Sequence, residues 1–350
     1  MKKNFYNNLF GILNSNGETF IISVTKGIYN GRSIVGQKLL KSKASIFIED
    51  DNITDFWNGI LNSVDFNKGT YILELENGIQ LFVEHVIGKP NLVICGGGHI
   101  ALPLCTMAKM LEFNTTIIDD REEFANKERF HMADNIICED FNEAFKKIIF
   151  NKNTYFVIVT RGHKDDRNCL ETILKNNFYY VGMIGSKGKV AFVINNMLEN
   201  GYTKEDIAKV HTPIGIKIGA QTPAEIAISI LGEIIQVKNE KLISNIDDKI
   251  LNEICKRDEP MVLGTIIEKR GSGPRGVGTK MLVYKNKEFI GTIGGGSVEN
   301  AAYEKALELI EIKESTLEEY DMSNSASAKL GMACGGTVKV LFEFIDKHTK

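Results

Sequence analysis

Short hydrophobic runs alternate with helical patterns through the middle of the chain, from about residue 91 to residue 239. The runs are continuous and often β-branched, which is typical of strands buried on both faces of a sheet. Five runs stand out, at Asn91–Cys95, Thr115–Asp119, Ala133–Cys138, Thr154–Thr160 and Tyr179–Gly185. Strands alternating with helices predict an α/β fold with a doubly wound, Rossmann-like parallel sheet. We assign residues 89–240 to this domain.

The first run leads into a glycine-rich turn, CGGGHIALPL. Gly96, Gly98 and Ala101 form a G-x-G-x-x-A pattern after a strand and at the start of a helix, with His99 and Ile100 in the same turn. Such glycines let a pyrophosphate approach the free N–H groups of a helix N-terminus. The turn therefore predicts a site for a dinucleotide, NAD or NADP.

Two acids end the second strand, about twenty residues after the turn, where a carboxylate can accept hydrogen bonds from a ribose. They are Asp119 and Asp120. Strand, turn, helix and acid together predict nucleotide-binding geometry. The alternative is a Rossmann-like scaffold that keeps the turn for packing.

A polar segment, TRGHKDDRN, follows the fourth strand. Ligands of doubly wound folds bind at the carboxyl ends of the strands. Candidates for ligand contact are Arg161, His163, Lys164 and Asp165. The alternative is a solvated loop that opens a helix, since acids in a first turn suit the helix dipole. A structural and a catalytic role both stay open for His211, which lies in a later Gly/Pro loop.

The last hundred residues, assigned to a domain at 245–350, contain the other glycine runs. A helix at Asp247–Arg257 and strands at Met261–Glu268 and Thr279–Tyr284 are predicted. The loop between the strands is rich in glycine, and its cations Arg270, Arg275 and Lys280 suit an anion cradle. A mobile hairpin tip is the alternative.

Three glycines then separate a strand at Glu288–Ile293 from a helix that ends near Ile310. They are Gly294, Gly295 and Gly296, followed by Ser297 as the expected N-cap and Glu299 in the first turn. Glycines that connect a strand to the N-terminus of a helix predict an anion site. The alternative is that they let strand, helix and loop pack closely.

A third glycine run, GMACGG, places Cys334 and Gly335 in a bend before the final strand. A thiol held in such a bend, near Arg275, is suited to act as a thiolate and as a soft ligand for a metal or a sulfur species. The other five cysteines are scattered without a CxxC pair, so neither a disulfide framework nor a zinc cluster is expected.

The net charge and the composition limit which partners and which compartment are expected. The chain has 350 residues and a formal net charge of -3, which gives no reason to expect nucleic acid or an anionic membrane as partner. No apolar run approaches the roughly 18 residues of a membrane span, and the first residues do not resemble a signal peptide. We therefore expect a cytoplasmic protein.

Several spaced motifs resemble one known family. LVICGGGHIALPL, TRGHKDD, YVGMIGSKGK and HTPIGIKIGAQTPAEIAISILGEI look like the Rossmann-type half of the xanthine dehydrogenase accessory proteins, the XdhC/CoxI family. RGSGPRGVGTKMLV, GTIGGGSVENAAYEKAL and LGMACGGTVKVLFE look like its other domain. The resemblance implies a chaperone-like, dimeric factor that binds molybdenum cofactor, aids its sulfuration and delivers it to a molybdenum hydroxylase, with a cysteine desulfurase as a further partner.

The chain departs from this family in two ways. The family commonly runs its domains in the opposite order, and its triple-glycine segment usually ends in cysteine where this chain has Ser297. The resemblance therefore leaves Cys334 as the one soft ligand for the metal of the cofactor.

An internal repeat offers a reason for the domain order. GRSIVGQKLL (residues 31–40) matches GPRGVGTKML (273–282) at five of ten positions, and QLFVEHV (80–86) is similar to KVLFEFI (339–345). Residues 1–88 are thus interpreted as a degenerate copy of the C-terminal domain. EDDN (49–52) falls where the other copy has GGGS, and its three acids would repel an anion. On this hypothesis the second copy alone binds the ligand.

Three classes of function stay open: a maturation chaperone, an NAD(P)-dependent oxidoreductase, and a nucleotide-binding regulatory module for a partner enzyme. The Rossmann turn favours the second, but His163 and His211 are the sole candidates for proton transfer. The chaperone is the function that the resemblance favours.

Overall fold

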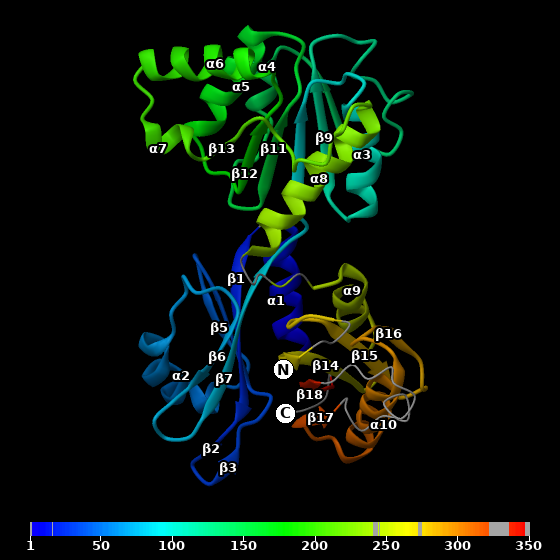
Figure 1. The fold of residues 1–350 in the computed structure, drawn as a ribbon. Coiled ribbons are helices and arrows are strands. Elements are labelled where there is room, and N and C mark those ends of the chain that lie inside the picture. Colours follow the sequence, from blue (N-terminus) through cyan, green and yellow to red (C-terminus); the bar gives the residue numbers. More distant parts are fainter. Residues whose placement is uncertain are drawn as a thin grey trace. The chain divides into compact units, whose positions relative to one another are not determined.

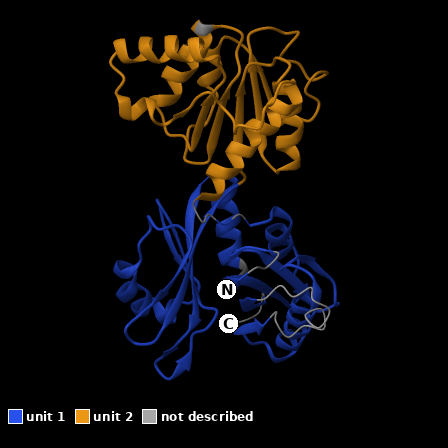
Figure 2. Cartoon of the chain, viewed as in Figure 1, with its two compact units in different colours: residues 1–88, 242–350 blue, residues 89–241 orange. Residues whose placement is uncertain are grey.

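The computed structural model describes residues 2–15, 17–240, 244, 246–271, 275–321 and 336–346 (Figure 1). The chain forms two units, residues 89–241 and residues 1–88 with 242–350 (Figure 2). The first and last of the three predicted segments therefore lie in one unit. In the described part of the chain, no helix is both long enough and apolar enough to cross a membrane.

The 89–241 unit is built on a six-stranded parallel sheet in the order β10-β9-β8-β11-β12-β13. Its strands are β8 (Asn91–Cys95), β9 (Asn114–Asp119), β10 (Asn135–Cys138), β11 (Thr154–Ile158), β12 (Tyr180–Met183) and β13 (Val210–His211). Numbered within the unit, this order is 3-2-1-4-5-6, the order of dinucleotide-binding folds. The predicted α/β fold with a Rossmann-like sheet is confirmed.

Helices cover both faces of this sheet (Figure 1). They are α3 (Ala101–Met110), α4 (Phe141–Phe145), α5 (His163–Leu174), α6 (Lys187–Glu199), α7 (Lys204–Ile207) and α8 (Pro223–Glu240). Leu92 and Ile94 of β8 point into the core beneath α3 and α8, whereas Val93 and Cys95 point into the core beneath α5 and α6. Burial on both faces explains why the strand is a continuous hydrophobic run.

The other unit contains two five-stranded antiparallel sheets. Residues 2–88 form α1 (Lys2–Asn14), β1 (Glu18–Lys26), β2 (Ile28–Tyr29), β3 (Arg32–Ser33), β4 (Lys38–Ser42), β5 (Ile46–Ile48), α2 (Thr54–Ile60, between 3-10 turns at Asp51–Ile53 and Leu61–Ser63), β6 (Tyr71–Glu74) and β7 (Gln80–Ile87). Residues 246–346 form α9 (Asp248–Lys256), β14 (Met261–Gly271), β15 (Lys280–Tyr284), β16 (Phe289–Gly291), α10 (Gly296–Ile312), β17 (Thr316–Asp321) and β18 (Gly336–Ile345).

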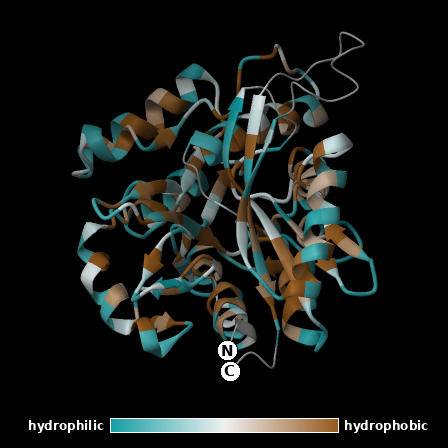
Figure 3. Ribbon diagram, turned by 90° about the horizontal axis from the view of Figure 1, so that it is seen from below, coloured by the Kyte–Doolittle hydropathy of each residue, from teal (hydrophilic) through white to brown (hydrophobic). Residues whose placement is uncertain are grey.

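Each of these sheets is covered on one face by its own helix, α2 or α10, and on the other face joins a shared core with α1 and α9. Figure 3 shows hydrophobic and hydrophilic residues alternating along the helices, as expected of helices with one buried face. The glycine segment 294–296 leads from β16 into α10, and its last residue is the first of the helix that covers the second sheet.

Candidate functional site

The glycine segment between β16 and α10 has a backbone that side chains disfavour. The φ angles of Gly294, Gly295 and Gly296 are 129°, 74° and 70°, all in the left-handed region. A Cβ added at Gly295 or Gly296 would meet no atom within 4 Å. At these two positions glycine is therefore required by the backbone conformation and not by a neighbour that comes close.

The side chain of Glu299 holds this segment in place. Its Oε2 atom accepts hydrogen bonds from the backbone N–H groups of Ile293 (3.0 Å) and Gly295 (3.1 Å) and from the hydroxyl of Thr292. Partial burial alone would raise the pKa of Glu299, but these hydrogen bonds outweigh it and leave the pKa below its usual value. A carboxylate of the chain itself thus already uses part of the anion-binding capacity of the glycine segment.

The N-terminus of α10 is exposed. The helix begins at Gly296, and its N-cap residue is Gly295, which has no side chain to cap the free N–H groups. The expected N-cap, Ser297, is the second residue of the helix and is exposed, so that prediction was wrong by two residues. The reason is that the left-handed glycines turn the chain into the helix earlier. The exposed first turn can receive an anion through its backbone N–H groups.

The cations predicted to flank this site have different surroundings. Arg275 is exposed, whereas Arg270 forms an ion pair with Glu268 at 2.7 Å. Lys280 was predicted for the anion cradle, but it is buried and forms an ion pair with Glu84. Its charge is already neutralised there, which corrects the prediction.

Cys334 and Gly335 lie outside the described residues. Their predicted proximity to Arg275 and to the glycine segment stays a prediction. In the part of the chain that the structure describes, no group of three or more His, Cys, Asp or Glu side chains could hold a metal ion.

The glycine turn of the Rossmann-like unit connects β8 to α3. It lies at the end of β8 where the strand order reverses, between β8 and β11 in the sheet. Gly96 has a φ of 111°, and its N–H donates to the carbonyl of Ile118 at 2.7 Å. A Cβ at Gly96 would lie 2.6 Å from the carbonyl oxygen of Val159. Both the conformation and the close approach of the neighbouring strand therefore require glycine. Ligands of doubly wound folds bind at such a reversal.

The two acids after β9 have different environments. Asp119 is buried, accepts a hydrogen bond from the N–H of Gly97 at 2.8 Å, and is paired with Arg121, whose Nε lies 2.8 Å from its Oδ1. Burial alone would raise the pKa of Asp119, but the hydrogen bonds from Arg121 and Gly97 hold it below its usual value. Asp120 has a side chain that is 49% exposed. Asp120, whose Oδ1 lies 3.8 Å from the Nε of Arg121, is therefore the more exposed of the two acids.

Further groups surround the same edge of the sheet. His99 and Arg161 are exposed, and Ile100 is the N-cap residue of α3. His163 is the first residue of α5. The structure thus brings the Gly96 turn and the Arg161 loop to one edge of the sheet, as β8 and β11 are neighbours.

A buried ion pair at this edge escaped the sequence analysis. Asp166 on α5 is fully buried; it pairs with Lys189 of α6 and accepts a hydrogen bond from Thr160 at 2.6 Å. It ties the start of α5 and the loop after β11 to the first turn of α6. A second acid, Glu233 of α8, lies 3.4 Å from His211. This contact favours the structural role of His211. The spacing along the chain could show neither that Lys189 pairs with Asp166 nor that Glu233 lies beside His211.

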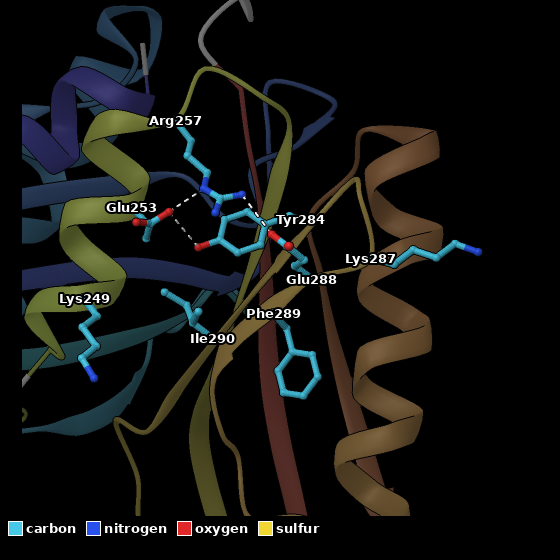
Figure 4. A pocket seen from close by; sticks show the side chains of 8 residues that line it. All are labelled: Lys249, Glu253, Arg257, Tyr284, Lys287, Glu288, Phe289 and Ile290. Carbon is cyan, nitrogen blue, oxygen red and sulfur yellow. Dashed lines mark hydrogen bonds and ion pairs between the residues drawn. The ribbon is translucent and has the colours of Figure 1, made fainter.

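A surface pocket of about 570 Å³ adjoins β16. It is lined by Lys249, Glu253, Arg257, Tyr284, Lys287, Glu288, Phe289 and Ile290 (Figure 4). The Arg257 guanidinium lies 4.2 Å from the centre of the Tyr284 ring and pairs with Glu253 at 2.5 Å and Glu288 at 3.4 Å. Glu253 and Glu288 thus neutralise the charge of Arg257, and the lining also contains Lys249 and Lys287. The sequence analysis placed no site there.

Models of known protein families match two ranges of this chain. A family model described as the XdhC Rossmann domain matches residues 92–234, and one described as the XdhC and CoxI family matches residues 254–321. The chain belongs to the XdhC/CoxI family. The first match contains the Gly96 turn and the second contains the glycine segment 294–296, whereas residues 1–88 lie outside both matched ranges.

Two relatives are similar to parts of this chain. An uncharacterized protein of Escherichia coli (strain K12), YqeB, is 34% identical over 152 residues, which are 43% of this chain and 28% of that protein. A protein of Bacillus subtilis (strain 168), described as a probable xanthine dehydrogenase subunit, is 22% identical over 213 residues, 60% of this chain and 62% of that protein. This XdhC/CoxI chain thus spans less than two thirds of either relative.

The crystal structure of a xanthine dehydrogenase from Bacillus halodurans is similar with a TM-score of 0.52 and 24% identity, over 67% of this chain and 66% of that one. This likeness shows a shared fold.

Proposed function

We propose that this XdhC/CoxI protein is an accessory factor that binds molybdenum cofactor and assists its sulfuration and its insertion into a hydroxylase of the xanthine dehydrogenase type. The observation that carries the proposal is the exposed, uncapped start of α10 behind three left-handed glycines, inside the part matched by the XdhC and CoxI family. The name of the Bacillus subtilis relative supports a xanthine dehydrogenase-type client.

The residues of this site suit the two ends of the cofactor as cargo. The phosphate of the pterin would be received by the first-turn N–H groups of α10, with Gly296 and Ser297 exposed, and by the cation of Arg275. Glu299 would position the glycine segment without using those first-turn groups. Cys334 is the proposed soft ligand for the metal.

The proposal includes partners and a compartment. A cysteine desulfurase would supply the sulfur while this protein holds the cofactor, and the client hydroxylase would receive it in the cytoplasm. The protein itself would act as a maturation factor and not as the hydroxylase. A homodimer is part of the same expectation.

A second activity is favoured by the strand order 3-2-1-4-5-6 and the Gly96 turn at its reversal, which suit a dinucleotide. We propose that the Rossmann-like unit binds NAD or NADP as a regulatory ligand. NAD(P)H oxidation with a small carbonyl substrate would instead favour an oxidoreductase.

An anaerobic titration with molybdenum cofactor tests the main proposal, with bound molybdenum and bound pterin as readouts. We expect binding by the wild type and at least a tenfold loss in Gly295→Asp and in Cys334→Ala, because one adds a negative charge at the phosphate end and the other removes the thiolate. Gly31→Asp is the matched control, since Gly31 has nearly the same φ, 75°, and equally open surroundings. Equal binding by Gly295→Asp and wild type would refute the site.

A further inference from the structure

The two antiparallel sheets have the same strand order. Their orders are β5-β4-β1-β7-β6 and β16-β15-β14-β18-β17. In both, a helix precedes the central strand, two strands lead out to one edge, a helix crosses over, and two strands return from the other edge. In Figure 1, α2 and α10 lie on the outer sides of their sheets. We call residues 2–88 the first copy and residues 246–346 the second copy.

Local irregularities coincide in the two copies. The pairing of β1 with β7 has a bulge after Val24, and the pairing of β14 with β18 has one after Ile266. Gly36 donates its N–H to the carbonyl of Val24 at 2.8 Å, and Gly278 does the same to Ile266, also at 2.8 Å. The φ angles of these glycines are 81° and 88°. A bulge and a left-handed glycine at the same place indicate a shared ancestry of the two sheets.

Two buried ion pairs connect the copies reciprocally. Lys38 of β4 pairs with Glu343 of β18 at 2.6 Å, and Lys280 of β15 pairs with Glu84 of β7. Lys38 and Lys280 occupy the same position in their sheets, as do Glu84 and Glu343. The four residues are between 2% and 7% exposed. Each copy thus contributes the same lysine and the same glutamate.

The apolar contacts between the copies are reciprocal in the same way. The core around α1 and α9 contains three equivalent pairs, and a smaller cluster contains three more, one member of each pair coming from each copy. They are Ile21 and Leu263, Leu40 and Leu282, Val86 and Ile345 in the larger core, and Phe82 and Leu341, Val35 and Val277, Ile72 and Leu317 in the smaller cluster. Equivalent residues that meet equivalent residues are the mark of a two-fold, isologous interface.

We propose that the two copies form an internal dimer, in which the first copy covers the surface through which the second copy would otherwise pair with a second copy from another chain. Each copy is self-complementary, because its lysine meets the glutamate of whichever copy lies opposite. The interface is closed within one chain. A homodimer of the intact protein must therefore use another surface.

The two copies are not equivalent at the start of the outer helix. In the first copy Asp50 accepts a hydrogen bond from the N–H of Asn52 at 3.0 Å and so caps its own helical turn, whereas the second copy has the uncapped glycine segment. The internal dimer consequently has one exposed glycine site in place of two. The first copy serves as the permanent partner of the copy that carries the site.

Charge reversal in the full chain tests this interface. Lys38→Glu with Glu84→Lys reverses the first copy alone, so both pairs become repulsive while the second copy stays self-complementary. We expect its Tm to fall by at least about 10 °C, and its mass by light scattering to rise with concentration as second copies pair between chains. Adding Lys280→Glu and Glu343→Lys restores both pairs with reversed sign. This fourfold variant should regain the mass of the wild type and most of its Tm.

Glu143→Lys with Lys146→Glu, which reverses an exposed pair elsewhere, is the control and should change neither readout. If the double variant simply unfolds, the fourfold variant still decides the matter. A fourfold variant no more stable than the double variant would overturn the proposal. So would a double variant that folds with unchanged mass at every concentration. Cofactor binding does not enter either readout, so this test can fail independently of the proposed function.

Discussion

At the scale of single residues, three glycines and one glutamate define the candidate site. The glycines could be found in the sequence, and so could the helix that follows them. That Glu299 folds back onto the N–H groups of the segment could not be predicted, because the side-chain conformation depends on how the chain enters α10. Cys334 shows the opposite limit, since its chemistry is readable from the sequence while its position lies outside the described residues.

The left-handed backbone predicts a specific cost for adding a side chain. Gly295→Ala should lower the free energy of unfolding by about 1–3 kcal/mol, since a Cβ is strained at a φ of 74° even in open space. Gly276→Ala, in equally open surroundings and without a positive φ, should change it by less than about 0.5 kcal/mol. Urea unfolding measures both. Equal effects would show that the backbone conformation is not the cause.

The lowered pKa of Glu299 predicts a pH dependence of stability. A carboxyl group whose pKa is lower in the folded state stabilises above its unfolded pKa, about 4.3, and loses this contribution as the pH falls through the folded value. At pH 7 Glu299→Gln should therefore be about 1–2 kcal/mol less stable than the wild type. The gap should narrow below about pH 4. A gap that is constant from pH 7 to pH 3.5 would contradict this role of the carboxylate.

At the scale of elements, the turn between β8 and α3 was predictable because a glycine pattern, two strands and an acid lie at fixed spacing. Which of the two acids is buried and which is exposed was not predictable. Asp119 and Asp120 are adjacent in the chain, but the end of a strand turns one side chain inward and the next outward. The pair of Asp166 with Lys189 was missed because its two members follow different strands.

This difference between the two acids can be measured. Asp119→Asn should lower the stability by about 1–3 kcal/mol, because Arg121 and the N–H of Gly97 lose a charged acceptor. Asp120→Asn should leave the stability within about 0.5 kcal/mol and weaken binding of NAD or NADP. Thermal unfolding and calorimetric titration give the two numbers. Nucleotide affinity that Asp120→Asn leaves unchanged would remove this residue from the proposed site.

At the scale of the whole molecule, the two copies share one strand order within a single unit. Five identities in ten positions predicted that residues 1–88 repeat the C-terminal domain, and the shared strand order supports this interpretation. The reciprocal ion pairs could not be predicted, because each joins residues that lie far apart in the chain and become neighbours when the two sheets pack. We therefore propose that the second copy, which contains the glycine segment, carries the function.

Reconstitution of a client enzyme tests whether this protein delivers molybdenum cofactor. The cofactor-free form of a xanthine dehydrogenase-type hydroxylase would be incubated anaerobically with molybdenum cofactor and a sulfur-loaded cysteine desulfurase, and its activity followed over time. We predict that the wild-type protein accelerates activation at least tenfold, that Gly31→Asp does the same, and that Gly295→Asp does not. Activation at the same rate without the protein, or with Gly295→Asp as with the wild type, would contradict the account.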